Sequence, residues 1–403
     1  MSSLSRRGFF TGVGAVAALS ATACTADGGN KAQAATIDPT TVEFNGVHQA
    51  GIATPGQTTM NLVGFKLNDG VSAKDVVRLM KVWTADGRAL CRGSNPLGSL
   101  EPEMADKVNQ LTITCGWGAH VFDVLGAANR RPSWLGDLEK FKTDKLDPQW
   151  GQTDLVLQIC SNDPLSAAYA MRHLVRAGVS YAKVQWVQHG FMRSSQTKTD
   201  EKTPRNLFGQ VDGTVNPHSD QEFDEVVWNA DGPDWMHGGT SMVVRRVQMH
   251  LDRWEMLDRD SRERAIGRKL SNGAPLTGEN EFDTADFDAT DQYGLKIIDP
   301  RSHMAIANPV SGTPEQRIRR RPYSYDMGTP RNGELTDSGL IFIAFQKDPV
   351  KQFSPIQRRL ADKDILNEWI THIGSAVYWV PPGTKDDNSY WAQGLIETID
   401  GLH

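Results

Sequence analysis

One carboxylate in this chain stands in an unusually restricted stretch of backbone. The segment GQVDGTVNP, residues 209–217, places Asp212 between Gly209 and Gly213, with an Asn-Pro pair close behind. Glycine and Asn-Pro are both typical of turns. The segment alone leaves two interpretations open. It is either a surface turn in which the aspartate binds its own backbone, or a device that holds an acid in place to move a proton.

The histidines narrow the metal chemistry that the chain can perform. Among ten histidines, His303 lies in DPRSHMAIANP, residues 299–309, where the short apolar run behind it predicts an edge strand or a loop. The sequence has no HExxH pattern and no second histidine near His303, which argues against a zinc or non-haem iron site. One imidazole is still enough to hold the iron of a haem.

Other kinds of site are missing from the sequence. There is no GxSxG elbow for a serine hydrolase and no Walker loop for nucleotide phosphates. The four cysteines are not spaced as a metal knuckle. Cys115 and Cys160 lie in apolar runs rich in strand-forming residues, so they are predicted to be buried thiols and not members of a disulfide scaffold.

The elements that must position these residues repeat along the chain. Each half contains two predicted strand-then-helix units, and the two halves have nearly equal lengths. The predicted strands span residues 58–68, 154–164, 240–251 and 339–349, and the predicted helices 72–83, 165–175, 262–270 and 350–361. This repetition predicts a duplicated α+β fold, in which each half is a ferredoxin-like antiparallel sheet with helices on one face. The polar stretch 194–206 is the predicted joint.

The bulk composition fits a globular protein and argues against a dedicated nucleic-acid binder. The chain has 403 residues, enough for two domains, of which 39% are hydrophobic and 23% charged. Its net charge is -6, whereas nucleic-acid binding requires a basic surface.

Residues 1–34 are predicted to be an export signal and not part of the fold. Residues 5–10, SRRGFF, carry the arginine pair of twin-arginine signals, and the mildly apolar stretch 11–23 is too short to span a membrane. The AQA tripeptide favours cleavage near Ala34, which would place the protein in the periplasm, in the cell envelope or outside the cell. Attachment of a lipid at Cys24 stays open as the alternative, although the residues before it form a poor lipobox.

Six segments occur together and in one order: HQAGIATPGQ (48–57), GQVDGTVNP (209–217), NGAPLTG (272–278), SHMAIANP (302–309), RRPYSY (320–325) and GLIFIAFQKDP (339–349). In this combination the chain closely resembles the exported bacterial branch of the dye-decolorizing peroxidases, over residues 40–403. The resemblance implies an α+β fold of two ferredoxin-like domains, of the dimeric α+β barrel type. The predicted parts are the signal (1–34), an N-terminal domain (35–205) and a C-terminal domain (206–403) that binds one haem b.

The resemblance also implies roles for single residues. His303 matches the proximal ligand of the haem iron, and Asp212 matches the distal acid. Arg320 matches the distal arginine, although its neighbours Arg319 and Arg321 leave a slip of one residue open.

Further positions around the cofactor follow from the same resemblance. Gly209 and Gly213 are expected to let the backbone pass close to the flat haem. Leu340 and Phe342 are expected to form an apolar wall beside its distal face.

The implied activity is that of an oxidoreductase. The enzyme would reduce hydrogen peroxide through a ferryl intermediate and oxidise dyes, phenolics or other one-electron donors, with Tyr390 and Trp391 as candidate surface relays for bulky donors. Two alternatives remain: a deferrochelatase-like or haem-carrying protein on the same fold, and a duplicated ligand-binding module without haem. A copper or iron trafficking partner is open, and no transmembrane segment is expected. Asp299 and Glu315 are the sequence-based candidates for the partner of the proximal imidazole.

Overall fold

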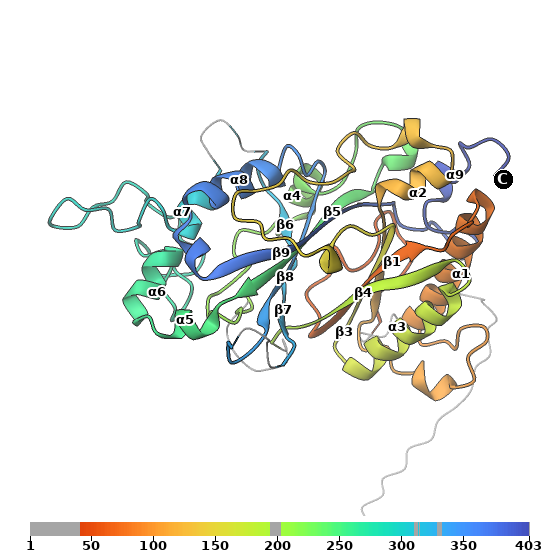
Figure 1. Ribbon diagram of the computed structural model, residues 1–403, viewed down its shortest axis with the longest axis horizontal. Coiled ribbons are helices and arrows are strands. Elements are labelled where there is room, and N and C mark those ends of the chain that lie inside the picture. The colour runs from red at the N-terminus through yellow and green to blue at the C-terminus, as the bar shows by residue number, and fades with distance from the viewer. Residues whose placement is uncertain (1–40, 194–202, 310–312, 314, 329–332, 403) are drawn as a thin grey trace, which may run out of the picture. The chain divides into compact units, whose positions relative to one another are not determined.

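The strands of this protein form one sheet that runs through both halves of the chain (Figure 1). The computed structural model describes residues 41–193, 203–309, 313, 315–328 and 333–402. Its strands are β1 (Thr59–Leu67), β2 (Thr112–Trp117), β3 (Leu155–Ser161), β4 (Ala182–Phe191), β5 (Thr240–Met249), β6 (Arg319–Arg320), β7 (Tyr323–Asp326), β8 (Ser338–Gln346) and β9 (Ile370–Val380). Its α-helices are α1 (Ala73–Cys91), α2 (Ala119–Val124), α3 (Pro164–Gly178), α4 (Asp220–Val226), α5 (Leu251–Glu255), α6 (Arg259–Ile266), α7 (His303–Ala307), α8 (Phe353–Lys363) and α9 (Gln393–Ile396).

Each half arranges its strands in the same order. The first half has the antiparallel order β4–β1–β3–β2, and the second has β9–β5–β8–β7. When β6 and β7, which both pair with β8, are counted as one interrupted strand, the first and third strands of each half lie at the centre and the second and fourth at the edges. This is the arrangement of a ferredoxin-like unit. The predicted duplicated α+β fold is therefore confirmed.

The strands of the two halves join at both edges, which makes one continuous sheet. Strand β2 meets β9 at Trp117 and Trp379, and β4 meets β7 at Phe191 and Ser324. Since β5 also pairs with β8, every strand except β6 belongs to a closed ring. Closure into a barrel leaves few sheet edges exposed, which protects the strands from pairing with other chains.

Local sequence signals account for where several elements begin and end. Ser72 and Asp75 form a capping box at the start of α1, where the predicted helix 72–83 also begins. The Asp-Pro pair at the end of β3 becomes the N-cap and first residue of α3, with Asp163 accepting the N–H of Ser166. Helix α6 ends at Ile266, earlier than predicted, because Gly267 adopts a φ of 92° that continues no helix.

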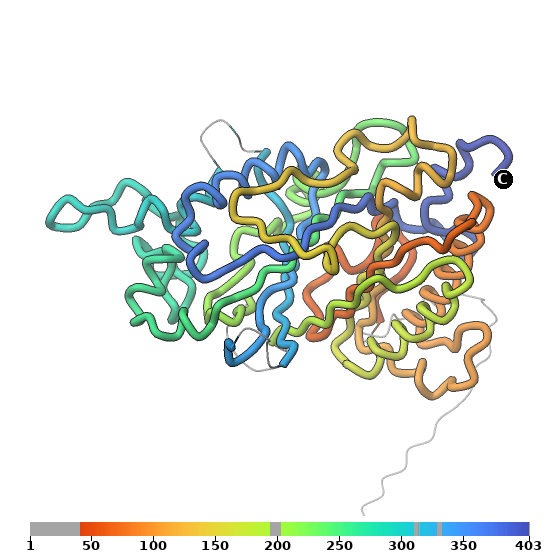
Figure 2. Tube along the Cα trace, in the orientation of Figure 1, coloured from red at the N-terminus to blue at the C-terminus, as the bar shows by residue number. Residues whose placement is uncertain are grey.

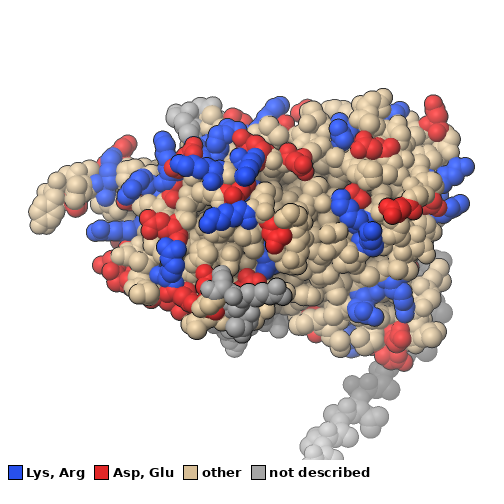
Figure 3. Space-filling model, viewed as in Figure 1, with Lys and Arg blue, Asp and Glu red and all other residues tan. Residues whose placement is uncertain are grey.

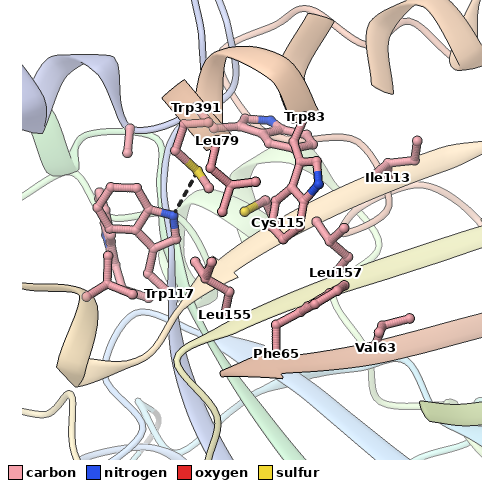
Figure 4. Packing of buried hydrophobic residues seen from close by; sticks show 14 of the residues in the cluster. Val63, Phe65, Leu79, Trp83, Ile113, Cys115, Trp117, Leu155, Leu157 and Trp391 are labelled. Carbon is pink, nitrogen blue, oxygen red and sulfur yellow. Dashed lines mark hydrogen bonds between the residues drawn. The ribbon is translucent and has the colours of Figure 1, made fainter. Parts of the chain in front are cut away.

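Within the described residues, this architecture forms three hydrophobic cores. One packs α1 and α3 against the outer face of the first-half strands, with Leu79 and Trp83 fully buried (Figure 4). Full burial of an apolar side chain such as that of Leu79 stabilises the fold by about 1.5–3 kcal/mol relative to leaving it exposed. A second core, including Met60 and Ile343, combines strand side chains from both halves, as expected for the inside of a ring. A third, smaller core around Trp254 lies in the second half.

The cysteines fit the sequence-based prediction. Cys115 and Cys160 are buried free thiols, as predicted, and Cys91 is a third one. Positive and negative side chains are interspersed on the face shown in Figure 3. No helix within the described ranges is long and apolar enough to cross a membrane. The predicted signal and most of the predicted joint lie outside the described residues, so the boundary at 205/206 stays a prediction.

Candidate active site

A cavity of about 580 Å³ lies on one face of the second-half strands. Alternate residues of β5 and β8 line it, because side chains two positions apart in a strand share a face. Helices α7 and α8, which lie side by side (Figures 1 and 2), and the segment 206–218 complete the wall. The strands contribute Arg245, Val247, Met249, Leu340, Phe342, Ile370 and His372. The volume is in the range of binding sites for cofactors and other small molecules.

His303 lines this cavity as the first residue of α7. The sequence-based prediction of an edge strand or loop was wrong, because the apolar run behind His303 consists of methionine, alanine and isoleucine, of which alanine and methionine are good helix formers. The helix is short because Asn308 and Pro309 follow, and a residue before proline avoids the helical conformation. The N–H of Ser302, the N-cap residue, donates to the carbonyl of Asp299 at 2.9 Å, so a turn fixes the start of the helix.

The imidazole of His303 is held by a buried aspartate at the end of α8. Asp364 caps the short 3₁₀-helix Ile365–Glu368, with Oδ1 accepting the N–H of Leu366 at 2.8 Å. Its Oδ2 accepts from Nδ1 of His303 at 2.6 Å. The side chain of Asp364 is 1% exposed and that of His303 32%. With the proton on Nδ1, the lone pair of His303 is on Nε2, which is the state that binds a metal.

The sequence-based candidates for this partner, Asp299 and Glu315, were wrong. Asp299 accepts the N–H of Arg301 at 2.8 Å, and Glu315 is exposed. Burial by itself lowers the pKa of His303, but the charge of Asp364 and its hydrogen bond outweigh burial, so the pKa is raised overall. Asp364 thus fixes both the orientation and the basicity of the imidazole.

We expect Asp364→Asn to lower the affinity of the protein for haem about 10–100-fold, as loss of such a partner does at other metal sites. The amide can still accept the N–H of Leu366, so the cap is kept. Its nitrogen, however, would donate to Nδ1 of His303 and move the ring proton to Nε2. Titration of the apoprotein with haem b, followed at the Soret band, measures the effect. Asp258→Asn, which changes an aspartate that caps α6, is the control. Unchanged affinity in Asp364→Asn would contradict the assigned role.

On the segment 206–218, Asp212 forms an ion pair with Arg320. Nη1 of Arg320 donates to Oδ1 of Asp212 at 2.7 Å, and Nδ2 of Asn206 donates to Oδ2 at 3.3 Å. The backbone N–H of Asp212 donates to the carbonyl of Pro204 at 2.9 Å. Both charged side chains line the cavity and are mostly buried, at 13% and 21% exposure. Two side-chain contacts and one backbone contact therefore hold the carboxylate in place.

Of the three consecutive arginines at positions 319–321, Arg320 is the one that lines the cavity. Arg319 and Arg321 are not among the lining residues. The side chain of Arg319 donates to the carbonyl of Ile52 at 3.4 Å, and that of Arg321 donates to the carbonyl of Thr54. This division follows from strand geometry, since residues i and i+2 of β6 and its extension share one face and residue i+1 takes the other. The structure therefore favours Arg320 over its two neighbours.

Of the other four residues that the resemblance implied, three line the cavity and one does not. Leu340 and Phe342 line the cavity from β8, and Gly213 lines it from the segment 206–218. Gly213 has a φ of 132°, a conformation that residues with a side chain rarely adopt. Gly209 also has a positive φ, of 78°, but it is not among the lining residues, so its contribution is to the turn.

The wall of the cavity fits a large, flat and mostly apolar cofactor with polar edges. Within the described part of the chain, four buried side-chain nitrogens of lining residues have no hydrogen-bond partner: Nε2 of Gln210, Nε of Arg245, Nε2 of Gln357 and Nδ1 of His372. An unsatisfied buried polar group costs about 1–3 kcal/mol, so a polar group of a ligand that reached one of these residues would recover part of that cost. Burial lowers the pKa of His372 to about 3, with smaller effects of Arg245 and His303. The imidazole of His303, with Asp364 bound to its Nδ1, and the apolar strand residues of the wall together fit haem b.

Fold and site together define a duplicated α+β protein with a cavity in its second half, which contains a histidine held by a buried aspartate. Comparison with known protein families identifies the family. Residues 49–192 match the model for the N-terminal part of Dyp-type peroxidases, and residues 203–385 match the model for their C-terminal part. The chain therefore belongs to the Dyp-type peroxidase family, a family of oxidoreductases, as the sequence resemblance implied.

Individual relatives agree with this assignment. The dye-decolorizing peroxidase of Thermobifida fusca (strain YX) is 42% identical over 71% of this chain and 67% of its own length. A deferrochelatase of Escherichia coli (strain K12) is 33% identical over 88% of this chain and 86% of its own length. Among solved structures, the DyP-type peroxidase from Cellulomonas bogoriensis matches with a TM-score of 0.85 and 42% identity, covering 90% of this chain and 98% of that one.

Sequence reasoning missed residues whose roles depend on tertiary contacts. Asp364 reads as an ordinary helix-capping aspartate, and Asn206 as part of a polar linker. The suggested relay Trp391 is 1% exposed and belongs to the first core, so it is not a surface residue. Tyr390 is half-buried, with the ammonium group of Lys81 over its ring.

Proposed function

We propose that the cavity binds one haem b through Nε2 of His303 and that the Asp212–Arg320 pair promotes the reduction of hydrogen peroxide there. The observation that carries this proposal is the composition of one cavity. It contains a histidine whose Nδ1 is bound to a carboxylate at 2.6 Å, and an acid–arginine pair at 2.7 Å. A protein that only carries haem has no need for the second pair.

Haem b, when bound, supplies an iron at which the O–O bond of peroxide is broken. Asp212 provides the proton transfer that this cleavage needs. Its Oδ1 is held by Arg320, whereas among the described residues Oδ2 has only the longer contact with Asn206 at 3.3 Å. We therefore assign the transfer to Oδ2, which accepts the proton of one peroxide oxygen and returns it to the other, so that this oxygen leaves as water.

Arg320 contributes a fixed positive charge next to the oxygen that gains electron density. An oriented charge in a site that excludes water stabilises a developing negative charge more strongly than it would in solution. The apolar side chains of the wall, such as Leu340 and Phe342, exclude water. Reduction of one peroxide to two water molecules takes up two electrons and two protons in total. The electrons come from dyes, phenolics or other donors, one electron at a time.

The related deferrochelatases support a second candidate function, in haem or iron handling. The two functions are separated by one experiment on the purified, haem-loaded protein. A peroxidase oxidises a dye only when hydrogen peroxide is present and keeps its iron. If iron-free porphyrin accumulates instead, and no dye is oxidised, the peroxidase function is wrong for this chain.

Export through the twin-arginine route stays a proposal, because residues 1–34 lie outside the described part of the chain. We expect a variant with Arg6→Lys and Arg7→Lys to accumulate as an uncleaved precursor inside the cell, since the signal would lose its defining pair. Cell fractionation and mass spectrometry of the mature N-terminus measure this. Export of the variant at the normal level would contradict the proposal, and a diacylglyceryl group on Cys24 would replace cleavage near Ala34 by lipidation. A copper or iron trafficking partner likewise stays a prediction.

A further inference from the structure

The side chain of Asn216 binds both backbone groups of Arg320. Its Oδ1 accepts the N–H of Arg320 at 2.8 Å, and its Nδ2 donates to the carbonyl of Arg320 at 2.9 Å. Asn216 is 7% exposed, so water does not compete readily for these two bonds. An asparagine amide is suited to this contact because it presents one donor and one acceptor side by side. Two parallel hydrogen bonds fix the orientation of a group as well as its distance.

Asn216 belongs to the same turn as Asp212. Its N–H donates to the carbonyl of Gly213 at 3.0 Å, and a Cβ added at Gly213 would lie 3.3 Å from Nδ2 of Asn216. The turn therefore carries the acid at one position and, four residues later, the side chain that holds the backbone of Arg320. Asp212 and Arg320 are 108 positions apart in the chain. This one turn contacts both the side chain of Arg320, through Asp212, and the backbone of Arg320, through Asn216.

The strand that carries Arg320 has few other restraints. Strand β6 is only two residues long and pairs with β8 at Phe345 and Ala344. The side chain of Arg321 is turned away from the cavity and donates to Gln57 in the segment 48–57. Arg320 is thus fixed through β8, through the neighbouring arginines and, on the side of the turn, through Asn216.

We propose that Asn216 is a positioning residue, which sets the distance and orientation of the Arg320 guanidinium relative to Asp212. The inference rests on the proposed function of the Asp212–Arg320 pair. A shift of about 1 Å in a catalytic group can cost about 10²-fold in rate, so loss of both backbone contacts has a measurable effect. Asn216 also lines the cavity, but its side-chain oxygen and nitrogen are both bound to the backbone of Arg320, so it acts through Arg320.

The test is a double-mutant cycle in the haem-loaded, full-length protein. Asn216→Ala, Arg320→Leu and the double variant are mixed with hydrogen peroxide, and the second-order rate constant is measured from the change of the Soret band. We expect Asn216→Ala to lower the rate constant about 10- to 100-fold. In the Arg320→Leu background the same change should have almost no further effect, because residues that act through one another are not additive.

Two measurements separate positioning from general stability. Hydrogen–deuterium exchange of the apoprotein should show faster exchange at the Arg320 amide in Asn216→Ala, while thermal unfolding stays close to that of the wild type. Asn162→Ala is the matched control, since Asn162 accepts the N–H of Thr58 at 3.1 Å and donates to Gln110 at 2.9 Å, away from the cavity. If Asn216→Ala folds poorly, Asn216→Asp keeps the volume and the acceptor but loses the donor, and should react at an intermediate rate.

The outcomes distinguish this inference from the function on which it rests. A wild-type rate in Arg320→Leu overturns both. A slow Arg320→Leu together with a wild-type rate in Asn216→Ala overturns the positioning role alone. Additive effects in the double variant also overturn it, because Asn216 would then act on the rate by a route that does not involve Arg320.

Discussion

Asp212→Ala is expected to lower the second-order rate constant for the reaction with hydrogen peroxide by about 10²–10⁴-fold, the usual contribution of a general base. Arg320→Leu should lower it by about 10²–10³-fold, the usual effect of removing one oriented charge or donor. Haem content should stay unchanged in both, because neither residue is the iron ligand. Arg320→Lys should restore little, since an ammonium group on a flexible stem does not reproduce the planar fork that meets Asp212 at 2.7 Å. Stopped-flow mixing of the ferric protein with peroxide measures all three.

Glu222→Gln is the matched control for these variants. Glu222 also lines the cavity and also pairs with an arginine, Arg317, at 2.6 Å, yet it has no assigned role in proton transfer. The pKa of Glu222 is lowered to about 2, mainly by the hydrogen bond from Arg317. We expect Glu222→Gln to react at close to the wild-type rate. If Asp212→Ala and Arg320→Leu also do so, the segment 209–217 is only a turn.

His303→Ala is expected to abolish or strongly weaken haem binding, because the imidazole is the proposed protein ligand of the iron. The Soret absorbance of the protein purified with haem b should fall to the level of unspecific binding. His250→Ala is the control, since His250 also pairs with a carboxylate, Glu334, at 2.7 Å but does not line the cavity. A wild-type haem content in His303→Ala would show that another residue binds the iron.

Much of the fold could be predicted from the sequence because its signals are local. The apolar runs that became β1, β3, β5 and β8 alternate with amphipathic helices, and Ser72 and Asp163 mark helix starts by their chemistry alone. The closure of the ring was implied by the family resemblance, but no pattern of residues predicted it. It depends on single contacts such as that between Trp117 and Trp379, which no local pattern encodes.

The residues of the candidate site likewise fall into those that the sequence could identify and those that only the folded structure shows. Asp212, Arg320 and His303 stand in short motifs, so a resemblance between sequences could identify them. Asp364 lies 61 positions from the histidine that it binds, and Asn216 lies 104 positions from Arg320. Asparagine and aspartate are common in turns and helix caps for local reasons, so their second contacts appear only when the chain is folded. The residues that orient the chemistry were therefore harder to predict than those that perform it.

The most direct measurement is an anomalous difference map, collected at the iron absorption edge from crystals of the haem-loaded protein. We predict one iron peak per chain, bonded to Nε2 of His303, with the side chains of Asp212 and Arg320 lining the remaining open position of the iron. An iron bound to His218 or His372, the other two histidines of the cavity wall, or an iron outside the cavity, would contradict the proposed site.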